Sequence, residues 1–185
     1  MKVINLEDLE HGVRVANYSI EIAKQANLSN KLFQSLYFSG LFHDVGKAYV
    51  NQDVLNKPGK LTNHERIQIT KHPIYSYEEI LSIGYSKEVA LNILYHHENW
   101  DGTGYPNGLK GQSIPIGARI LKIADVFDAL TVERPYRGRL TINETLMIME
   151  KEKTTYDPEL YFLFTEYLIK TYITKEKKYI NLEHT

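Results

Sequence analysis

Residues 32–47 have the sequence LFQSLYFSGLFHDVGK, which starts as an apolar stripe and ends in charged residues. The apolar and small residues recur at three- and four-residue steps, as in the buried face of an amphipathic helix. The stripe runs directly into His43 and Asp44, so the helix carries an imidazole and a carboxylate to the edge of the core. Because buried polar groups need partners, the stretch predicts a helical protein with a polar site at this edge.

The rest of the chain repeats the helical pattern and shows no convincing pair of strands. Thr62 and Thr141 are each followed three residues later by a glutamate, the capping-box signature of a helix start. We therefore predict an all-α bundle with one helical domain over residues 1–172 and a charged, frayed tail over 173–185. The expected helices cover 7–26, 29–43, a segment from 62, 73–84, 86 to about 97, 116–130, a segment from 141, and 158–171.

Two loops interrupt the helices. Residues 99–117 contain five glycines and two prolines without apolar periodicity, which predicts a long irregular loop. Loops of this length in compact domains are usually functional or disordered, and this Gly/Pro-rich segment is expected to be an active-site loop. Residues 133–140 form a second, basic loop.

The composition limits the possible partners and metals. The 185 residues carry a formal net charge of -1, so no general basic field attracts duplex nucleic acid or an anionic membrane. No segment is apolar for long enough to span a membrane and no signal peptide is evident, so we predict a cytoplasmic protein. The chain has no cysteine, which leaves imidazole and carboxylate as ligands and favours iron or manganese over structural zinc.

Histidines and carboxylates at the predicted helix ends form a candidate metal centre. Adjacent helical residues point about 100° apart, so the pairs at 43–44 and 96–97 approach a shared point from different sides. Two ions about 3.5–4 Å apart need such divergent ligands, with Asp44 or Asp125 as a bridging carboxylate. The candidate ligands are Glu7, His11, His43, Asp44, His72, His96, His97 and Asp125.

Simpler interpretations exist for several of these charged residues. His64 and His184 are expected to be surface histidines. Asp125 lies among apolar residues and needs a cation, which could be a metal ion or the buried Arg119. Lys47 lies three residues after Asp44, so it either forms a plain ion pair with Asp44 or binds a phosphate oxygen and helps to protonate a leaving alkoxide. The expected nucleophile is a metal-bound water with its pKa lowered to about 7.

Five blocks of sequence follow one another along the chain: Phe42-His43-Asp44-Val45-Gly46-Lys47, His72-Pro73, His96-His97-Glu98-Asn99-Trp100-Asp101-Gly102-Thr103-Gly104-Tyr105-Pro106, Ala124-Asp125-Val126-Phe127-Asp128-Ala129-Leu130-Thr131, and Arg134-Pro135-Tyr136-Arg137. In this order they resemble the HD-GYP family of cyclic di-GMP phosphodiesterases, and the similarity runs from about Glu7 to Leu168. The resemblance implies an HD-domain fold and hydrolysis of cyclic di-GMP to linear pGpG, GMP or both. It also implies two or three ions, of iron or manganese.

The same resemblance assigns roles within the site. The eight candidate ligands fall on the family's metal positions, with Glu7 as the extra carboxylate of three-metal members. Asp44 and Lys47 are the expected catalytic residues. Lys47, Tyr105, Arg134 and Arg137 are the expected contacts with the dinucleotide.

Two other functions compete with this one. The chain could act on another nucleotide, including cyclic GMP-AMP, because the base preference is not readable from sequence. It could also be a catalytically weak scaffold that binds a diguanylate cyclase domain or a sensor domain.

Overall fold

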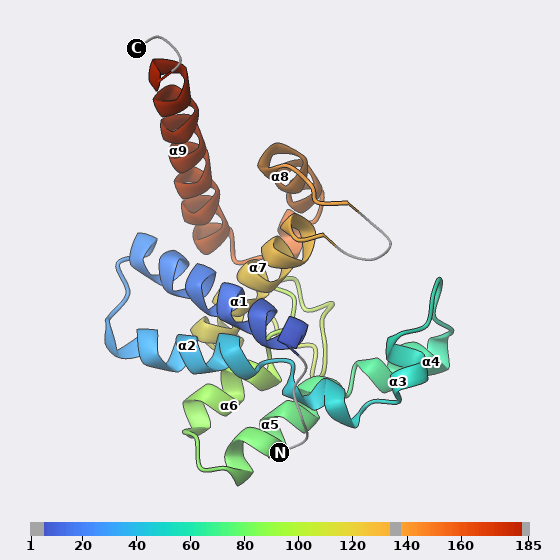
Figure 1. Ribbon diagram of the computed structural model, residues 1–185. Helices are drawn as coiled ribbons and strands as arrows, with labels where there is room; N and C mark the ends of the chain where they lie inside the picture. Colours follow the sequence, from blue (N-terminus) through green and yellow to red (C-terminus); the bar gives the residue numbers. More distant parts are fainter. Residues whose placement is uncertain (1–5, 134–137, 183–185) are drawn as a thin grey trace.

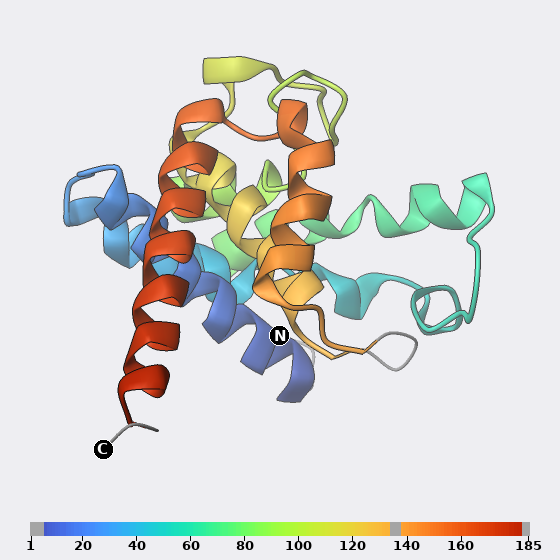
Figure 2. The same cartoon turned by 90° about the horizontal axis from the view of Figure 1, so that it is seen from above.

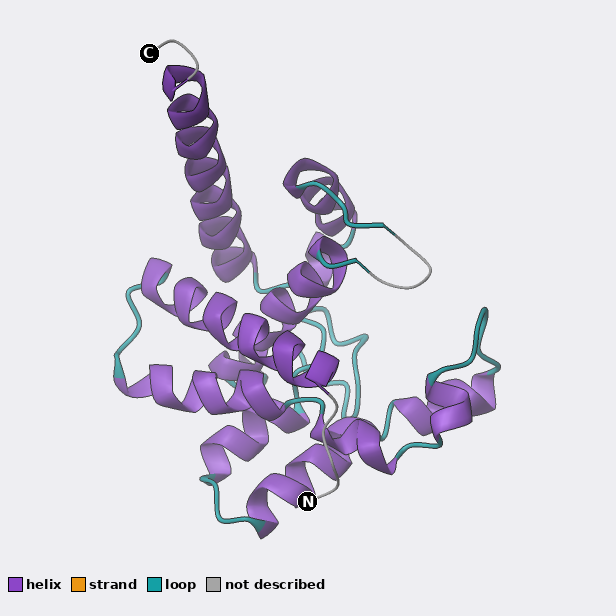
Figure 3. Cartoon of the chain, in the orientation of Figure 1, coloured by secondary structure: helices purple, strands orange, loops and turns teal. Residues whose placement is uncertain are grey.

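The computed structural model describes residues 6–133 and 138–182, with side chains as far as residue 171, and every regular element in these ranges is a helix (Figure 3). The predicted all-α class is confirmed. The elements are α1 Leu6–Gln25, α2 Lys31–Phe42, the 3₁₀ turn η1 Val45–Tyr49, α3 Gln52–Leu55, α4 Asn63–Ile69, α5 His72–Ser82, α6 Lys87–Leu94, η2 Gly111–Ser113, α7 Ile116–Thr131, α8 Ile142–Lys151, η3 Lys153–Thr155 and α9 Pro158–Leu182.

Local signals in the sequence place most helix starts correctly. The capping boxes at Thr62 and Thr141 both form, with hydrogen bonds in both directions to the glutamate three residues on. Ser86 caps α6 by accepting a hydrogen bond from a backbone amide of the first turn. Asn30 directly precedes α2 and provides no side-chain cap, whereas Ser29 Oγ accepts a hydrogen bond from the amide of Lys31 at 3.4 Å.

Helix α7 forms the centre of the fold and contacts α1, α2, α6, α8 and α9 (Figure 1). It is buried along most of its length, so the aspartates that it carries are held by a rigid element. A second apolar cluster joins η1, α5 and α6 beside α2. This cluster brings together the ends of the helices that carry histidines. The buried side chains of α7 that define the core are Ile120, Leu121, Ile123, Ala124 and Phe127.

Residues 51–70, which we call the arm, extend from the body of the molecule (Figures 1 and 2). The arm contains α3 and α4, which are joined by an irregular segment at 56–62, and α4 has no buried residue.

The end of the chain differs from the prediction. Helix α9 was expected to end near Thr171 and to be followed by a frayed tail, but it continues to Leu182. Helix α9 crosses the proposed boundary between a domain at 1–172 and a tail at 173–185. That division stays a prediction. No described helix combines the length and apolar character that a membrane crossing needs.

Candidate metal centre

Three histidines at helix ends each make the same type of hydrogen bond, which fixes the tautomer of the ring. His43 follows α2, His72 begins α5 and His96 follows α6. The Nδ1 atoms of these residues lie 2.8, 2.7 and 2.6 Å from the carbonyl oxygen three residues earlier. A carbonyl only accepts, so each Nδ1 carries the proton of a neutral imidazole, and Nε2 is then the nitrogen left to accept or to bind a metal ion. Carbonyls at helix ends lack intrahelical partners, which is why this arrangement recurs.

The bare acceptors face one another in a buried space. The Nε2 atoms of His43, His72 and His96 and Oδ1 of Asp44 have no hydrogen-bond partner among the described residues. His72 Nε2 lies 3.2 Å from Asp44 Oδ1, and His43 Nε2 lies 3.3 Å from Asp44 Oδ2. Acceptors facing one another without a proton are costly when desolvated, so this geometry fits a cation held between them.

Nearby positive charge keeps the Asp44 side chain ionised, which is the form that binds a cation. Burial alone would raise the pKa of Asp44, but the charge of Lys47 and the adjacent His43 hold this pKa well below its usual value. Lys47 Nζ lies 2.5 Å from Asp44 Oδ2, so the ion pair that was one of the two readings of Lys47 is present. Lys47 also lines the cleft described below, which leaves its proposed contact with phosphate open.

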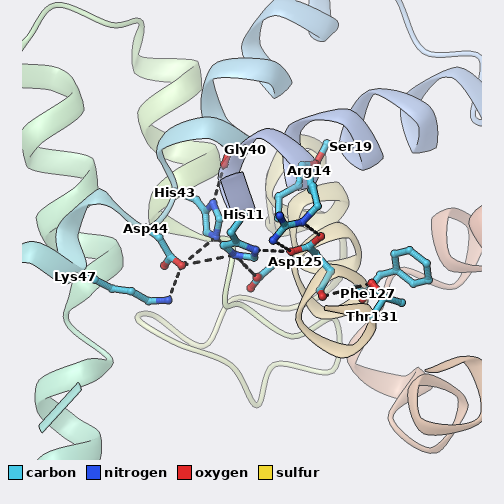
Figure 4. Close-up of polar contacts among 12 residues, drawn as sticks. His11, Arg14, Ser19, Gly40, His43, Asp44, Lys47, Asp125, Phe127 and Thr131 are labelled. Carbon is cyan, nitrogen blue, oxygen red and sulfur yellow. Dashed lines mark hydrogen bonds and ion pairs between the residues drawn. The ribbon is translucent and has the colours of Figure 1, made fainter. Parts of the chain in front are cut away.

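His11 is held by a carboxylate and arginine pair that the sequence did not reveal (Figure 4). Its Nδ1 lies 2.7 Å from Asp128 Oδ2, and both oxygens of Asp128 accept hydrogen bonds from Arg14 at 2.7 and 3.1 Å. On the other side of the ring, Nε2 lies 3.2 Å from Asp125 Oδ1. Burial lowers the pKa of His11, but the hydrogen bonds to Asp125 and Asp128 outweigh it and raise the pKa to about 9. An incoming cation therefore has to displace a proton at this position.

His96 and His97 are neutral and available as ligands. Burial is the main reason that the pKa of His96 lies well below its usual value and that the pKa of His97 falls to about 3. A neutral imidazole is the form that binds metal ions.

Seven of the eight candidate ligands meet in overlapping groups whose ligand atoms lie within 4.8 Å of one another. Glu7 is the exception. It is exposed in the first turn of α1, one turn from His11, and belongs to none of these groups, although it lines the same cleft. The groups are His72 with His96 and His97, His11 with His43 and Asp125, and His43 with Asp44 and His96.

Arg119 does not neutralise Asp125. Its guanidinium lies 2.6 Å from Asp157 and 5.6 Å from the ring centroid of Trp100. The alternative in which Arg119 is the partner of Asp125 is therefore wrong.

The Gly/Pro-rich loop reaches the metal centre through Tyr105. Its ring packs on His97 with centroids 4.8 Å apart and planes inclined by 31°. Burial raises the pKa of Tyr105, so the hydroxyl stays protonated and able to donate. Arg134 and Arg137 lie outside the described residues.

A cleft of about 1740 Å³ opens beside these donors. One part is lined by His11, Asp44 and Lys47, and another by Lys57 and Gly59 of the arm. Seven carboxylates but only three lysine or arginine side chains line it among the described residues. The cleft therefore repels a polyanion unless cations are bound.

Residues 5–160 match the family model described as an HD domain. The chain belongs to the HD-domain family. This HD domain is 40% identical over 146 residues to the 3'3'-cGAMP-specific phosphodiesterase 1 of Vibrio cholerae, which covers 77% of the chain and 33% of that relative. It is 38% identical over 149 residues to the cyclic di-GMP phosphodiesterase response regulator RpfG of Xanthomonas campestris, covering 78% of the chain and 39% of the relative. The chain thus spans little more than a third of these relatives, and the predicted family resemblance is confirmed.

Solved structures agree on the fold. The HD domain matches a cyclic GMP-AMP phosphodiesterase of Vibrio cholerae with a TM-score of 0.68 at 25% identity, over 88% of this chain and 46% of that one. It also matches an HDG"Y"P protein of Bdellovibrio bacteriovorus with a TM-score of 0.71 at 23% identity, over 91% of this chain and 55% of that one.

Removal of metal is expected to lower the melting temperature by about 10 °C. A ligand at 1,000 times its Kd stabilises by about 4 kcal/mol, and each kcal/mol is worth about 2–4 °C in a domain of this size. Thermal melts before and after chelation, followed by addition of manganese or ferrous iron, measure the shift. His64→Ala, on the exposed arm, should keep the shift, whereas His72→Ala should lose most of it. Equal melting temperatures with and without chelator would contradict a buried metal centre.

Asp128→Asn is expected to weaken metal binding about 10- to 100-fold, the usual effect of removing a carboxylate that orients a histidine ligand. The variant removes the charge that His11 and Arg14 share. Metal titration of the chelated protein measures the change. Asp53→Asn, an exposed residue of α3, serves as the control, and equal affinities in both variants would rule out the orienting role.

Proposed function

We propose that this chain is a metal-dependent phosphodiesterase that hydrolyses cyclic di-GMP to linear pGpG, GMP or both. The observation that carries the proposal is the convergence of buried, unpaired imidazole nitrogens and a carboxylate oxygen beside a cleft of about 1740 Å³. The names of the Vibrio and Xanthomonas relatives as cyclic dinucleotide phosphodiesterases support the choice of substrate.

The donor set fits two or three divalent ions, and we propose iron or manganese because every candidate ligand is an imidazole or a carboxylate. When bound, the ions lower the pKa of water and offset negative charge on the phosphate. A third ion would be held with the help of Glu7, which lies one helical turn from His11. The proposed ligands are Glu7, His11, His43, Asp44, His72, His96, His97 and Asp125.

The chain's own cations and donors would hold the substrate. Burial lowers the pKa of Lys47, but Asp44 outweighs it and the pKa is raised, so the ammonium persists. It lies beside Asp44 in the cleft, where it can donate to a phosphate oxygen or to a leaving alkoxide. Tyr105 is proposed to contact a base or phosphate through its ring edge or its protonated hydroxyl. Arg134 and Arg137 are proposed to meet the second phosphate.

Incubation of metal-loaded protein with cyclic di-GMP under reducing conditions, with products separated by chromatography, tests the activity. Linear dinucleotide or GMP is the expected result with manganese or ferrous iron. Absence of both products would overturn the proposal.

Cyclic GMP-AMP is the second candidate substrate, since relatives at 40% identity are named as specific for it. Parallel assays give the ratio of kcat/KM for the two dinucleotides. A scaffold that binds a diguanylate cyclase or sensor domain remains the non-enzymatic alternative. It is favoured if His43→Ala with Asp44→Ala leaves the cellular effect of the chain unchanged. A cytoplasmic location stays a prediction.

A further inference from the structure

Glu98 follows the metal-centre histidines directly, yet its carboxylate is bound by the loop. The residue is 2% exposed. Its Oε1 accepts a hydrogen bond from the backbone amide of Asn107 at 2.7 Å, and its Oε2 accepts one from Leu109 at 3.0 Å. Both oxygens therefore accept hydrogen bonds from residues 107 and 109 of the Gly/Pro-rich loop, and Glu98 belongs to none of the candidate metal groups.

These two bonds are made by residues that follow Tyr105 in the loop. The backbone amide of Tyr105 donates to His97 O at 3.2 Å, and its ring packs on the His97 ring. Next to it, Gly104 lies so close to the backbone of residues 97–99 that an added Cβ would be 2.2 Å from the nitrogen of Asn99. The loop is thus folded back onto residues 97–99. Glu98 holds the part of the loop that leaves Tyr105, beginning two residues later.

We infer that Glu98 is a positioning residue that keeps Tyr105 against His97, and that it acts on substrate binding through Tyr105 and not on the metal centre. Hydrogen bonds to a buried carboxylate are among the stronger ones in proteins, which suits a residue that fixes an irregular loop. The identity of the substrate and its contact with Tyr105 rest on the proposed function.

Glu98→Gln tests the role because it preserves shape and removes one acceptor. The amide NH₂ would face a backbone N–H, so one of the two loop bonds is lost and two donors are opposed. We expect KM for cyclic di-GMP to rise about 10- to 100-fold with a smaller change in kcat. Metal content and hydrolysis of bis(4-nitrophenyl) phosphate, which is too small to need the loop, should stay at the wild-type level. Glu88→Gln, exposed at the start of α6, is the matched control.

A double-mutant cycle with Tyr105→Ala separates positioning from a general structural effect. If Glu98 acts through Tyr105, the double variant should have nearly the same KM as Tyr105→Ala alone. Additive losses would overturn the inference. A loss of metal or of bis(4-nitrophenyl) phosphate hydrolysis in folded Glu98→Gln would also overturn it. Should Glu98→Gln fail to fold, Glu98→Asp retains both acceptors on a shorter side chain and goes through the same cycle.

Loop order is measurable without any nucleotide. Trp100 is the chain's only tryptophan, and its carbonyl accepts a hydrogen bond from Gly111 just beyond the segment that Glu98 holds. Glu98→Gln should shift tryptophan emission to longer wavelength and increase quenching by acrylamide. Unchanged emission would contradict the role of Glu98. If the wild type fails to hydrolyse cyclic di-GMP while this shift occurs, the proposed substrate is wrong and the positioning role stands.

Discussion

Asp44→Asn is expected to lower kcat/KM for the cyclic dinucleotide by at least about 1,000-fold, since a metal ion's contribution of several kcal/mol corresponds to this factor. Asp44 is the most connected donor of the centre. Its oxygens lie 3.8 Å from His11, 3.3 Å from His43 and 3.2 Å from His72, and Lys47 pairs with it. An amide keeps the shape but removes the charge that those imidazoles need opposite a shared cation.

Steady-state kinetics with metal analysis of the purified variant measure this loss. Metal content should fall together with activity, while the helical circular dichroism signal should be retained. Asp53→Asn should match the wild type in both. Full metal occupancy and activity in Asp44→Asn would show that the cations lie elsewhere.

Gly46→Ala is expected to destabilise the protein by about 3 kcal/mol, the upper end of the usual cost of overpacking, and to lower the melting temperature by about 6–12 °C. An added Cβ would lie 2.1 Å from the carbonyl oxygen of His72 and 2.5 Å from the amide nitrogen of Ser76. Both are backbone atoms, so relief requires η1 and α5 to separate. That movement would also break the contacts in which Ser76 Oγ accepts from Gly46 N and donates to His43 O.

Gly138→Ala is the control, because no atom of the described residues lies within 4 Å of the Cβ that it would add. Thermal melts of both variants in chelator and in manganese give two comparisons. Gly46→Ala should lower the melting temperature in chelator. It should also reduce the increase in melting temperature on adding manganese, since it displaces His72 from Asp44. A variant with the wild-type melting temperature would mean that η1 and α5 are not held at this distance.

Much of the secondary structure was predictable because its signals are local. A capping box acts within four residues, as at Thr62 and Thr141, and an apolar stripe within a few turns. The prediction was wrong where those signals weaken. Helix α9 continues past Thr171 through a polar sequence.

The candidate ligands were predictable as residue types, but the supporting residues were not. Asp128 lies 117 residues from His11 in sequence, and no local pattern connects them. The available signals were its spacing of three from Asp125 on one helix and its place in a block shared with the family. Glu98 was visible only as part of a motif, since its partners are backbone amides 9 and 11 residues away that have no side-chain signature.

The sequence by itself determined the helical class, the restriction of metal ligands to imidazole and carboxylate, and the family. These depend on composition, periodicity and motifs that can be read one segment at a time. Only the tertiary structure decided that His72 meets Asp44, that Arg119 pairs with Asp157, and that Gly46 is needed for close packing against α5. Each of these follows from atoms of distant segments coming within about 3 Å, and such contacts exist only when the whole core is packed.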